Sequence, residues 1–238
     1  MTDAHCHVSG GDPTVREFLI GRDFVGVHPW DSEQTPGDVG AWLRAQLDVN
    51  AKLGVGEIGL DRLKSREISP RMRTVFETQL CVALDCCRPV VLHGAKCWGQ
   101  VVAKIQEETI RREGEGNPGR EIPSFLFHGF SRSDGLLPAI VALNGYVSVG
   151  PAVLNDHAVN YRALVKKVPL DRLLVETDRD GDPAQMLNPL TGAPLTIRDV
   201  LEKTALVRGL SVPELEAVTD ANALRLLSSS RELCRAGR

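Results

Sequence analysis

Two histidines, His5 and His7, stand two residues apart at the start of this 238-residue chain. In an extended strand, side chains at this spacing point to the same face, so both imidazoles can reach one point. A single metal ion requires that convergence, whereas few structural roles do. The alternative is a half-buried strand in which each imidazole is simply hydrogen-bonded. The pair alone leaves both interpretations open.

Further along the chain, short apolar runs end in side chains of the types that bind metals. These ends are His28, Glu57, His93, His128 and the segment Glu176-Thr177-Asp178. Strand ends can hold almost any residue, so chance is a poor explanation for the same pattern in nearly every run. Histidine, glutamate and aspartate together form a ligand set for one or two divalent cations of the zinc, manganese or magnesium kind.

The elements that must position these residues alternate between strand and helix. After the first strand, strand-like runs occupy 24–27, 53–56, 89–92, 125–127, 145–150 and 173–175. Helical patterns cover 14–19, 39–50, 71–87, 100–112, 136–143, 157–167 and 222–227, and Ser211 has the sequence context of a helix N-cap.

Alternation of this kind predicts an α/β fold with a buried parallel sheet. We expect a (β/α)8 TIM barrel with its active site at the carboxyl ends of the strands. Its short or irregular eighth strand is expected between Pro183 and Thr196. An open doubly wound sheet is the alternative, but no Gly-rich phosphate turn follows the first strand.

Composition indicates one globular domain over 1–238, with 42% hydrophobic and 25% charged residues. The charged, Gly/Pro-rich stretch 111–121 is predicted to be an exposed loop. The net charge of −3 argues against a surface that coats long nucleic acid, while allowing a local pocket for one phosphate.

The six cysteines, two of them adjacent at Cys86-Cys87, form neither a disulfide framework nor a C-x-x-C zinc motif. They indicate thiols in a reducing compartment. Without a signal peptide or membrane-spanning run, we expect a cytoplasmic protein, or a nuclear one in a eukaryote, with no membrane partner. The sequence leaves the oligomeric state open, a monomer included.

Taken together, the motifs resemble those of the TatD family of metal-dependent hydrolases and deoxyribonucleases, which have amidohydrolase-like TIM barrels. The similar segments follow the family order over nearly the whole chain: Asp3-x-His5-x-His7, Gly26-Val27-His28-Pro29, Gly56-Glu57-Ile58-Gly59-Leu60-Asp61, Val91-Leu92-His93, Phe127-His128-Gly129-Phe130-Ser131, Glu176-Thr177-Asp178 and Asn222-Ala223-Leu224-Arg225-Leu226-Leu227.

The resemblance implies two divalent metal ions, zinc, magnesium or manganese. One would be held by His5, His7 and Asp178 and the other by His93 and His128, with Glu57 bridging both. Asp178 and Glu57 would be the catalytic residues, with Asp178 as general base toward a hydroxide that bridges the metals.

We therefore predict a divalent-metal-dependent hydrolase, specifically a TatD-like deoxyribonuclease that cleaves phosphodiesters at the 3′ end of DNA. One alternative is a hydrolase with the same metal pair that acts on a small ester, amide or phosphate. Another is a catalytically silent metal-binding interaction module, although a scaffold would have no need of a bridging Glu57. The expected partner is accordingly a DNA end or a small phosphoester or ester.

Several residues near the ligands are candidate substrate contacts. His28 could contact substrate or only hydrogen-bond to a ligand, and Trp30 and Phe130 could stack on a base or only pack against a helix. Departures from the family pattern place Lys96 after His93 and Arg179-Asp180-Gly181-Asp182 after Asp178. Cations here could bind phosphate or be solvated loop charges, as could three others: Arg62, Lys64 and Arg66.

Overall fold

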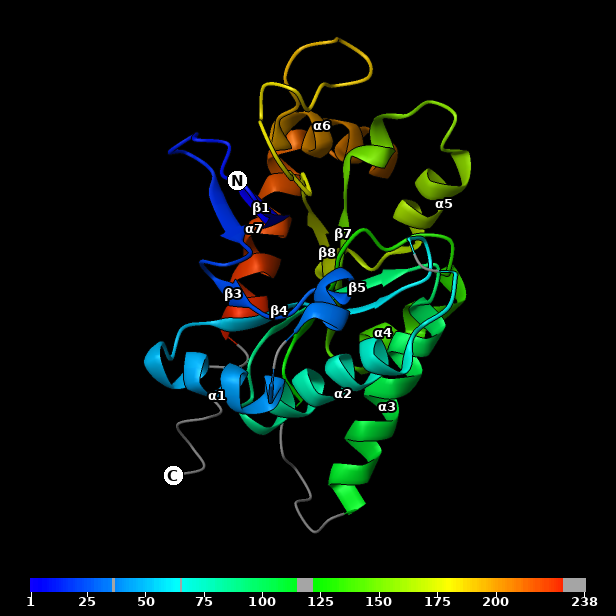
Figure 1. Cartoon of the computed structure of the whole chain (residues 1–238). Helices are drawn as coiled ribbons and strands as arrows, with labels where there is room; N and C mark the ends of the chain where they lie inside the picture. The colour runs from blue at the N-terminus through cyan, green and yellow to red at the C-terminus, as the bar shows by residue number, and fades with distance from the viewer. Residues whose placement is uncertain (36, 65, 115–121, 229–238) are drawn as a thin grey trace.

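The computed structural model describes residues 1–35, 37–64, 66–114 and 122–228. Its strands are β1 (Thr2–Cys6), β2 (Arg16–Leu19), β3 (Phe24–Val25), β4 (Gly54–Asp61), β5 (Val90–Ala95), β6 (Phe125–Phe127), β7 (Gly145–Val149) and β8 (Leu173–Val175). Its α-helices are α1 (Val39–Val49), α2 (Pro70–Asp85), α3 (Trp98–Gly114), α4 (Leu137–Ala142), α5 (Val159–Lys167), α6 (Ile197–Arg208) and α7 (Val212–Ser228). Figure 1 shows how they are arranged.

All strand pairs are parallel, as predicted. One sheet runs in the order β3-β4-β5-β6-β7-β8, and β1 pairs with β2 in a second sheet. Backbone contacts join the two sheets at both edges: the Asp178 amide donates to the His5 carbonyl at 3.0 Å, and Ile20 bridges to Phe24. The fold is therefore TIM-barrel-like, although the ladders of the described residues do not form one continuous ring.

The N-terminal part of the chain corrects two predictions. Residues 14–19, expected to be helical, contain strand β2, and no helix separates β1 from β2 or β2 from β3 among the described residues. Pairing with β1 buries Phe18 and Leu19, whereas an isolated helix of six residues is not stable.

The strand expected in 183–196 is absent, since that segment forms only one antiparallel bridge, between Leu187 and Pro194.

Most of the predicted helices are confirmed within a few residues, and their caps explain where they begin. Asp38 accepts hydrogen bonds from the first turn of α1, and Ser69 accepts from α2. Ser211 and Glu214 make the reciprocal bonds of a capping box at the start of α7. Helix α6, absent from the predictions, begins with another capping box, between Thr196 and Asp199.

Apolar side chains fill the molecule in two clusters. The smaller one gathers one residue from every strand except β4 with two residues of α7, Ala223 and Leu226. The larger one lies between the sheet and the surrounding helices. Behind β1 and β3, α7 packs against β1 and β8 (Figure 1). A rigid sheet closed from behind in this way can hold side chains at its other end in fixed positions.

Two further expectations concern the chain as a whole. No helix within the described ranges combines the length and hydropathy needed to cross a bilayer. Of the predicted loop at 111–121, residues through Gly114 belong to α3, while 115–121 lie outside the described residues, as does Cys234.

Asn222 provides a test of how α7 is attached to the sheet. Its buried side-chain amide donates to the carbonyls of Leu170 at 2.9 Å and Leu173 at 2.7 Å. Asn222→Leu leaves both carbonyls without a donor, so we expect the free energy of unfolding to fall by about 2 kcal/mol in urea titrations. Leu224→Ala, on the exposed side of α7, should change it by less than about 0.5 kcal/mol. Equal effects of the two substitutions would contradict this role.

Candidate metal centre

The residues predicted to bind metal come from five strands and the segments that follow them. His5 lies in β1, Glu57 in β4 and His93 in β5, while His128 directly follows β6 and Asp178 follows β8. Glu57 and His93 are thus inside their strands and not at the strand ends. Close packing of β4 against β5 makes this possible, because a Cβ at Gly59 would lie 2.0 Å from the His93 carbonyl oxygen.

Glu57 is at the centre of the cluster. Its Oε2 atom lies 3.3 Å from Nε2 of both His5 and His7. Its Oε1 atom lies 2.5 Å from Nδ1 of His93 and 2.7 Å from Nε2 of His128. Each carboxylate oxygen therefore faces one pair of imidazoles, which is the arrangement that a carboxylate bridging two cations requires.

Asp178 lies beside the first pair of imidazoles. Its Oδ1 atom is 3.4 Å from Nε2 of His5 and 3.8 Å from Nε2 of His7. Its side chain is 45% exposed, whereas Glu57 is almost fully buried. The φ of Asp178 is +50°, in the left-handed region that non-glycine residues seldom adopt. This backbone conformation and exposure place a carboxylate between the imidazoles and solvent.

Around His5, the ligand atoms are arranged for a bound cation and not for hydrogen bonds to one another. His5, His7 and Asp178 form one group whose ligand atoms lie within 4.8 Å of each other, and His5, Glu57 and His128 form another. Both ring nitrogens of His5 are buried without a hydrogen-bond partner, although carboxylate oxygens approach within 3.4 Å. Atoms that surround a common point without bonding to each other are typical of a metal site.

The electrostatics of the site are those of coupled acids and imidazoles. Burial and the nearby His128 lower the pKa of His5, but Asp178 and Glu57 outweigh them and raise it to about 9. Burial opposes the same change at His128, yet Glu57 and Glu176 raise the pKa of that residue well above its usual value. Burial would raise the pKa of Glu57, but His128 and the other imidazoles hold it well below the ordinary range. Divalent cations would replace the protons on these imidazoles.

Two acids that the sequence analysis did not assign to the site support its histidines from behind. Asp61 Oδ2 lies 2.9 Å from Nε2 of His93, on the opposite side of the ring from Glu57. Glu176 Oε1 lies 3.7 Å from Nδ1 of His128 and accepts from the Gly129 amide at 2.7 Å. The hydrogen bond to Asp61 fixes the orientation of the His93 imidazole, and, against the lowering effect of burial, the charge of Glu176 helps Glu57 to raise the pKa of His128. Both acids belong to the sequence motifs: Asp61 lies four residues after Glu57, and Glu176 lies two residues before Asp178.

Three of the predicted substrate contacts are at least partly accessible to solvent: His28, Trp30 and Lys96. Nε2 of His28 is 3.4 Å from Nδ1 of His93 and 3.5 Å from Glu57 Oε1, so His28 belongs to the cluster itself. Trp30 is 45% exposed, and its indole donates to Asp61 at 2.9 Å. Lys96 is exposed at the turn after β5.

The other two predicted contacts are buried away from solvent, which corrects the prediction. Phe130 is 1% exposed and packs against Trp98 and Phe127, so its ring has no free face for a base. Arg179 is 5% exposed and pairs with Glu17 at 3.2 Å. A charge in this position attaches the end of β8 to β2 and is not available to substrate.

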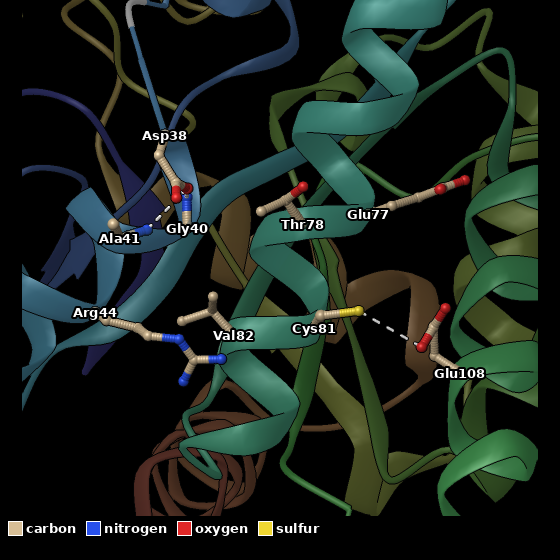
Figure 2. Close-up of a pocket in the computed structure, with 9 residues that line it drawn as sticks. All are labelled: Asp38, Gly40, Ala41, Arg44, Glu77, Thr78, Cys81, Val82 and Glu108. Atoms are coloured by element: carbon tan, nitrogen blue, oxygen red, sulfur yellow. Dashed lines mark hydrogen bonds between the residues drawn. The ribbon is translucent and has the colours of Figure 1, made fainter.

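A separate cavity of about 520 Å³ opens among helices α1, α2 and α3 (Figure 2). Arg44 comes from α1, Cys81 from α2 and Glu108 from α3, and the Cys81 thiol donates to Glu108 at 3.5 Å. None of the predicted metal ligands lines this cavity, so it is a feature of the outer helices and not of the metal centre.

Imidazoles gathered around a buried carboxylate, on a barrel-like parallel sheet, characterise metal-dependent hydrolases, and comparison with known proteins leads to the same class. The family model described as TatD related DNase matches residues 21–228. The chain belongs to this family, as its motifs indicated, and it is a metal-dependent hydrolase.

Known relatives share about a quarter of their residues with the chain. An uncharacterized metal-dependent hydrolase of Bacillus subtilis, YabD, is 28% identical over 88% of the chain and 80% of its own length. A protein of Pectobacterium parmentieri named 3′-5′ ssDNA/RNA exonuclease TatD is 25% identical over 85% of the chain and 76% of its own length.

Solved structures support the fold. The crystal structure of YJJV, a TatD homolog from Escherichia coli, matches 91% of the chain and 78% of its own, with a TM-score of 0.71 and 24% identity. At this identity the match bears on the barrel-like architecture alone.

Asp61→Asn tests the support of His93. The amide keeps the shape but gives His93 a neutral partner, so we expect divalent-metal affinity to fall about 10–100-fold, measured by titration against a competing chelator. Asp31→Asn, an exposed acid of the neighbouring 3-10 helix (Pro29–Gln34), should leave the affinity unchanged. Equal affinity in the Asp61 variant and the unmodified protein would exclude this role.

The raised pKa of His5 predicts how pH acts on the metal-free protein. Its value of about 9 exceeds the ordinary 6.5, so the native state binds the proton more tightly than the unfolded state. The resulting stabilisation is fully present below about pH 6.5 and is lost as pH rises through about 9. With chelator, the melting temperature should fall across this window, and His5→Gln should flatten the fall. With saturating metal the trend should weaken or reverse, because metal affinity rises as protons leave the ligands. A melting temperature that rises with pH under chelation would disprove this account.

Proposed function

We propose that this metal-dependent hydrolase cleaves phosphodiester bonds at the 3′ end of DNA. The observation that carries the proposal is the position of Glu57, with one oxygen toward His5 and His7 and the other toward His93 and His128. A site for two cations that share one carboxylate suits the displacement of an alkoxide from phosphate, which requires charge stabilisation at both the attacking and the leaving oxygen.

In the proposed site, His5, His7 and Asp178 would hold one cation, His93 and His128 the other, and Glu57 both. Zinc, manganese and magnesium are the candidates that suit imidazole and carboxylate ligands. When bound, the cations would supply a water of lowered pKa and would polarise the phosphoryl oxygen. Because the protein arranges the ligands before substrate arrives, little reorganisation is required in the reaction.

Asp178 is the proposed general base. Its carboxylate is half-exposed, while the other proposed ligand carboxylate, Glu57, is buried between the imidazoles. Burial would raise the pKa of Asp178, but the His5 imidazole and the other imidazoles lower it, so the group is ionised at neutral pH and can accept a proton from water. His28, within 3.5 Å of Glu57, is placed to donate to a phosphoryl oxygen or to orient His93.

Phosphate is favoured over a neutral ester by the charges around the site. Cations follow the ligand strands at Arg62, Lys64, Arg66 and Lys96, and all four side chains are exposed. A phosphodiester carries a negative charge that these cations attract, whereas a carboxylic ester or amide does not. The net charge of −3 fits an enzyme that engages the end of a strand and not its length. The exonuclease name of several relatives supports the same substrate.

Substitution of the two central carboxylates tests the proposal. Glu57→Gln and Asp178→Asn should each reduce metal-dependent release of nucleotides from 3′-labelled single-stranded DNA by at least about 100-fold. Asp180→Asn, which removes an exposed acid two residues further on, should retain activity.

A substrate panel separates the proposed activity from its alternatives. Wild-type protein loaded with zinc, manganese or magnesium should cleave DNA from the 3′ end in preference to neutral carboxylic esters and lactones. Turnover of the esters alone would assign the metal pair to another hydrolase activity, and metal binding without any turnover would favour an interaction module.

A further inference from the structure

Trp30 forms part of a continuous line of side chains that begins at the metal centre and reaches the surface. His93 lies against Asp61, which accepts a hydrogen bond from the Trp30 indole at 2.9 Å. The Trp30 ring is 6.2 Å from the His93 ring and 4.8 Å from the His28 ring, both edge to face. The indole is therefore held in one orientation beside a proposed metal ligand, and it is 45% exposed.

Lys64 ends this line at the surface. Its ammonium nitrogen lies 4.2 Å from the centroid of the Trp30 ring, within the range of a cation–π contact. Its backbone amide donates to Asp61 Oδ1 at 2.7 Å, so one carboxylate fixes both the main chain of Lys64 and the ring beneath its side chain. Of the nearby cations, Arg62 instead turns toward its own loop, where its Nε donates to the Arg66 carbonyl at 3.5 Å.

Lys64 has no acidic partner among the residues that the structure describes. No carboxylate in the described parts of the chain lies within ion-pair distance of its ammonium group, whereas Lys104 and Lys167 each face an acid. The indole covers one side of the ammonium and leaves hydrogen-bond donors toward solvent. A fixed, unpaired lysine one aromatic ring away from a metal ligand is suited to bind an anionic group as a point charge.

We propose that Lys64 binds a second phosphate of the substrate, next to the phosphate that is cleaved. The inference rests on the proposed phosphodiesterase function and gives the enzyme a preference for strands with at least two successive phosphates. The Trp30 ring contacts the Lys64 ammonium and the His28 ring. We therefore assign Trp30 the role of positioning Lys64 in place of stacking on a base. Neutral esters, amides and lactones would gain nothing from this contact.

A dinucleotide with one phosphate and a trinucleotide with two provide the test. For the metal-loaded wild type, we expect kcat/KM to be about tenfold higher with the trinucleotide, the effect of one charge-assisted contact. Lys64→Gln should abolish this preference, because it should lower kcat/KM for the trinucleotide about tenfold more than for the dinucleotide. Lys64→Arg should retain most of the preference. Lys166→Gln, which removes an exposed lysine at the end of α5, should retain all of it.

Equilibrium binding separates a failure of this inference from a failure of the proposed function. In fluorescence anisotropy with a labelled trinucleotide, Lys64→Gln should bind about tenfold more weakly. The slope of log affinity against log salt should fall by about 0.7, as expected for one lost phosphate contact on a single strand. If wild type cleaves neither substrate but the binding difference is present, the phosphodiesterase function fails and the Lys64 site stands. If Lys64→Gln matches wild type in binding and in substrate preference, the Lys64 site is excluded even when DNA is cleaved.

Discussion

A buried carboxylate among imidazoles is the interaction on which the rest of the site depends. Transfer of an isolated carboxylate into a protein interior is strongly unfavourable unless positive charge and hydrogen bonds compensate for it. Around Glu57, five histidines supply that compensation: His5, His7, His28, His93 and His128. In the metal-free protein the raised pKa values of His5, His93 and His128 favour protonated imidazoles beside the carboxylate, and in the loaded protein cations would take the place of these protons. The same electrostatic requirement therefore serves both folding and chemistry.

The histidines are in turn held by a second set of acids at the ends of neighbouring strands. Asp61 lies behind His93 and Glu176 behind His128, and each also accepts backbone amide hydrogen bonds. His93 is thus held by its strand and oriented by the Asp61 carboxylate, while the Glu176 carboxylate lies 3.7 Å behind His128. Because strands of a parallel sheet hold their carboxyl ends together, residues far apart in the chain share these contacts.

The sequence predicted the fold class and indicated which residues would gather into one cluster. Ligand-type residues at successive strand ends are a repeated signal, and the structure brings all six predicted metal ligands into one cluster. The sequence does not show whether a side chain points toward the site or into the core, so roles that depend on this orientation could not be assigned. Phe130 and Arg179 follow ligands in the chain but point into packed surroundings, and Lys64 was one of several equivalent loop cations until Trp30 gave it a position.

The errors in the fold have a related cause. Residues 16–19, with two charged and two apolar side chains, are too few for their pattern to distinguish helix from strand, and pairing with β1, a tertiary contact, decides for the strand. At 183–196 the expected eighth strand was inferred only from the count of a regular barrel. Helix α6 could have been found from its capping box, since Thr196 and Asp199 have the required spacing.

The joining of β1 to the end of β8 has a consequence for how the protein is made. His5 and His7 are translated before Asp178, which follows roughly 10–40 s later at ordinary rates of translation. A nascent chain carries two exposed imidazoles without their acid partner throughout that interval. A polypeptide that ends before Asp178 therefore has the two imidazoles of the first proposed cation site without its carboxylate ligand and without the proposed base.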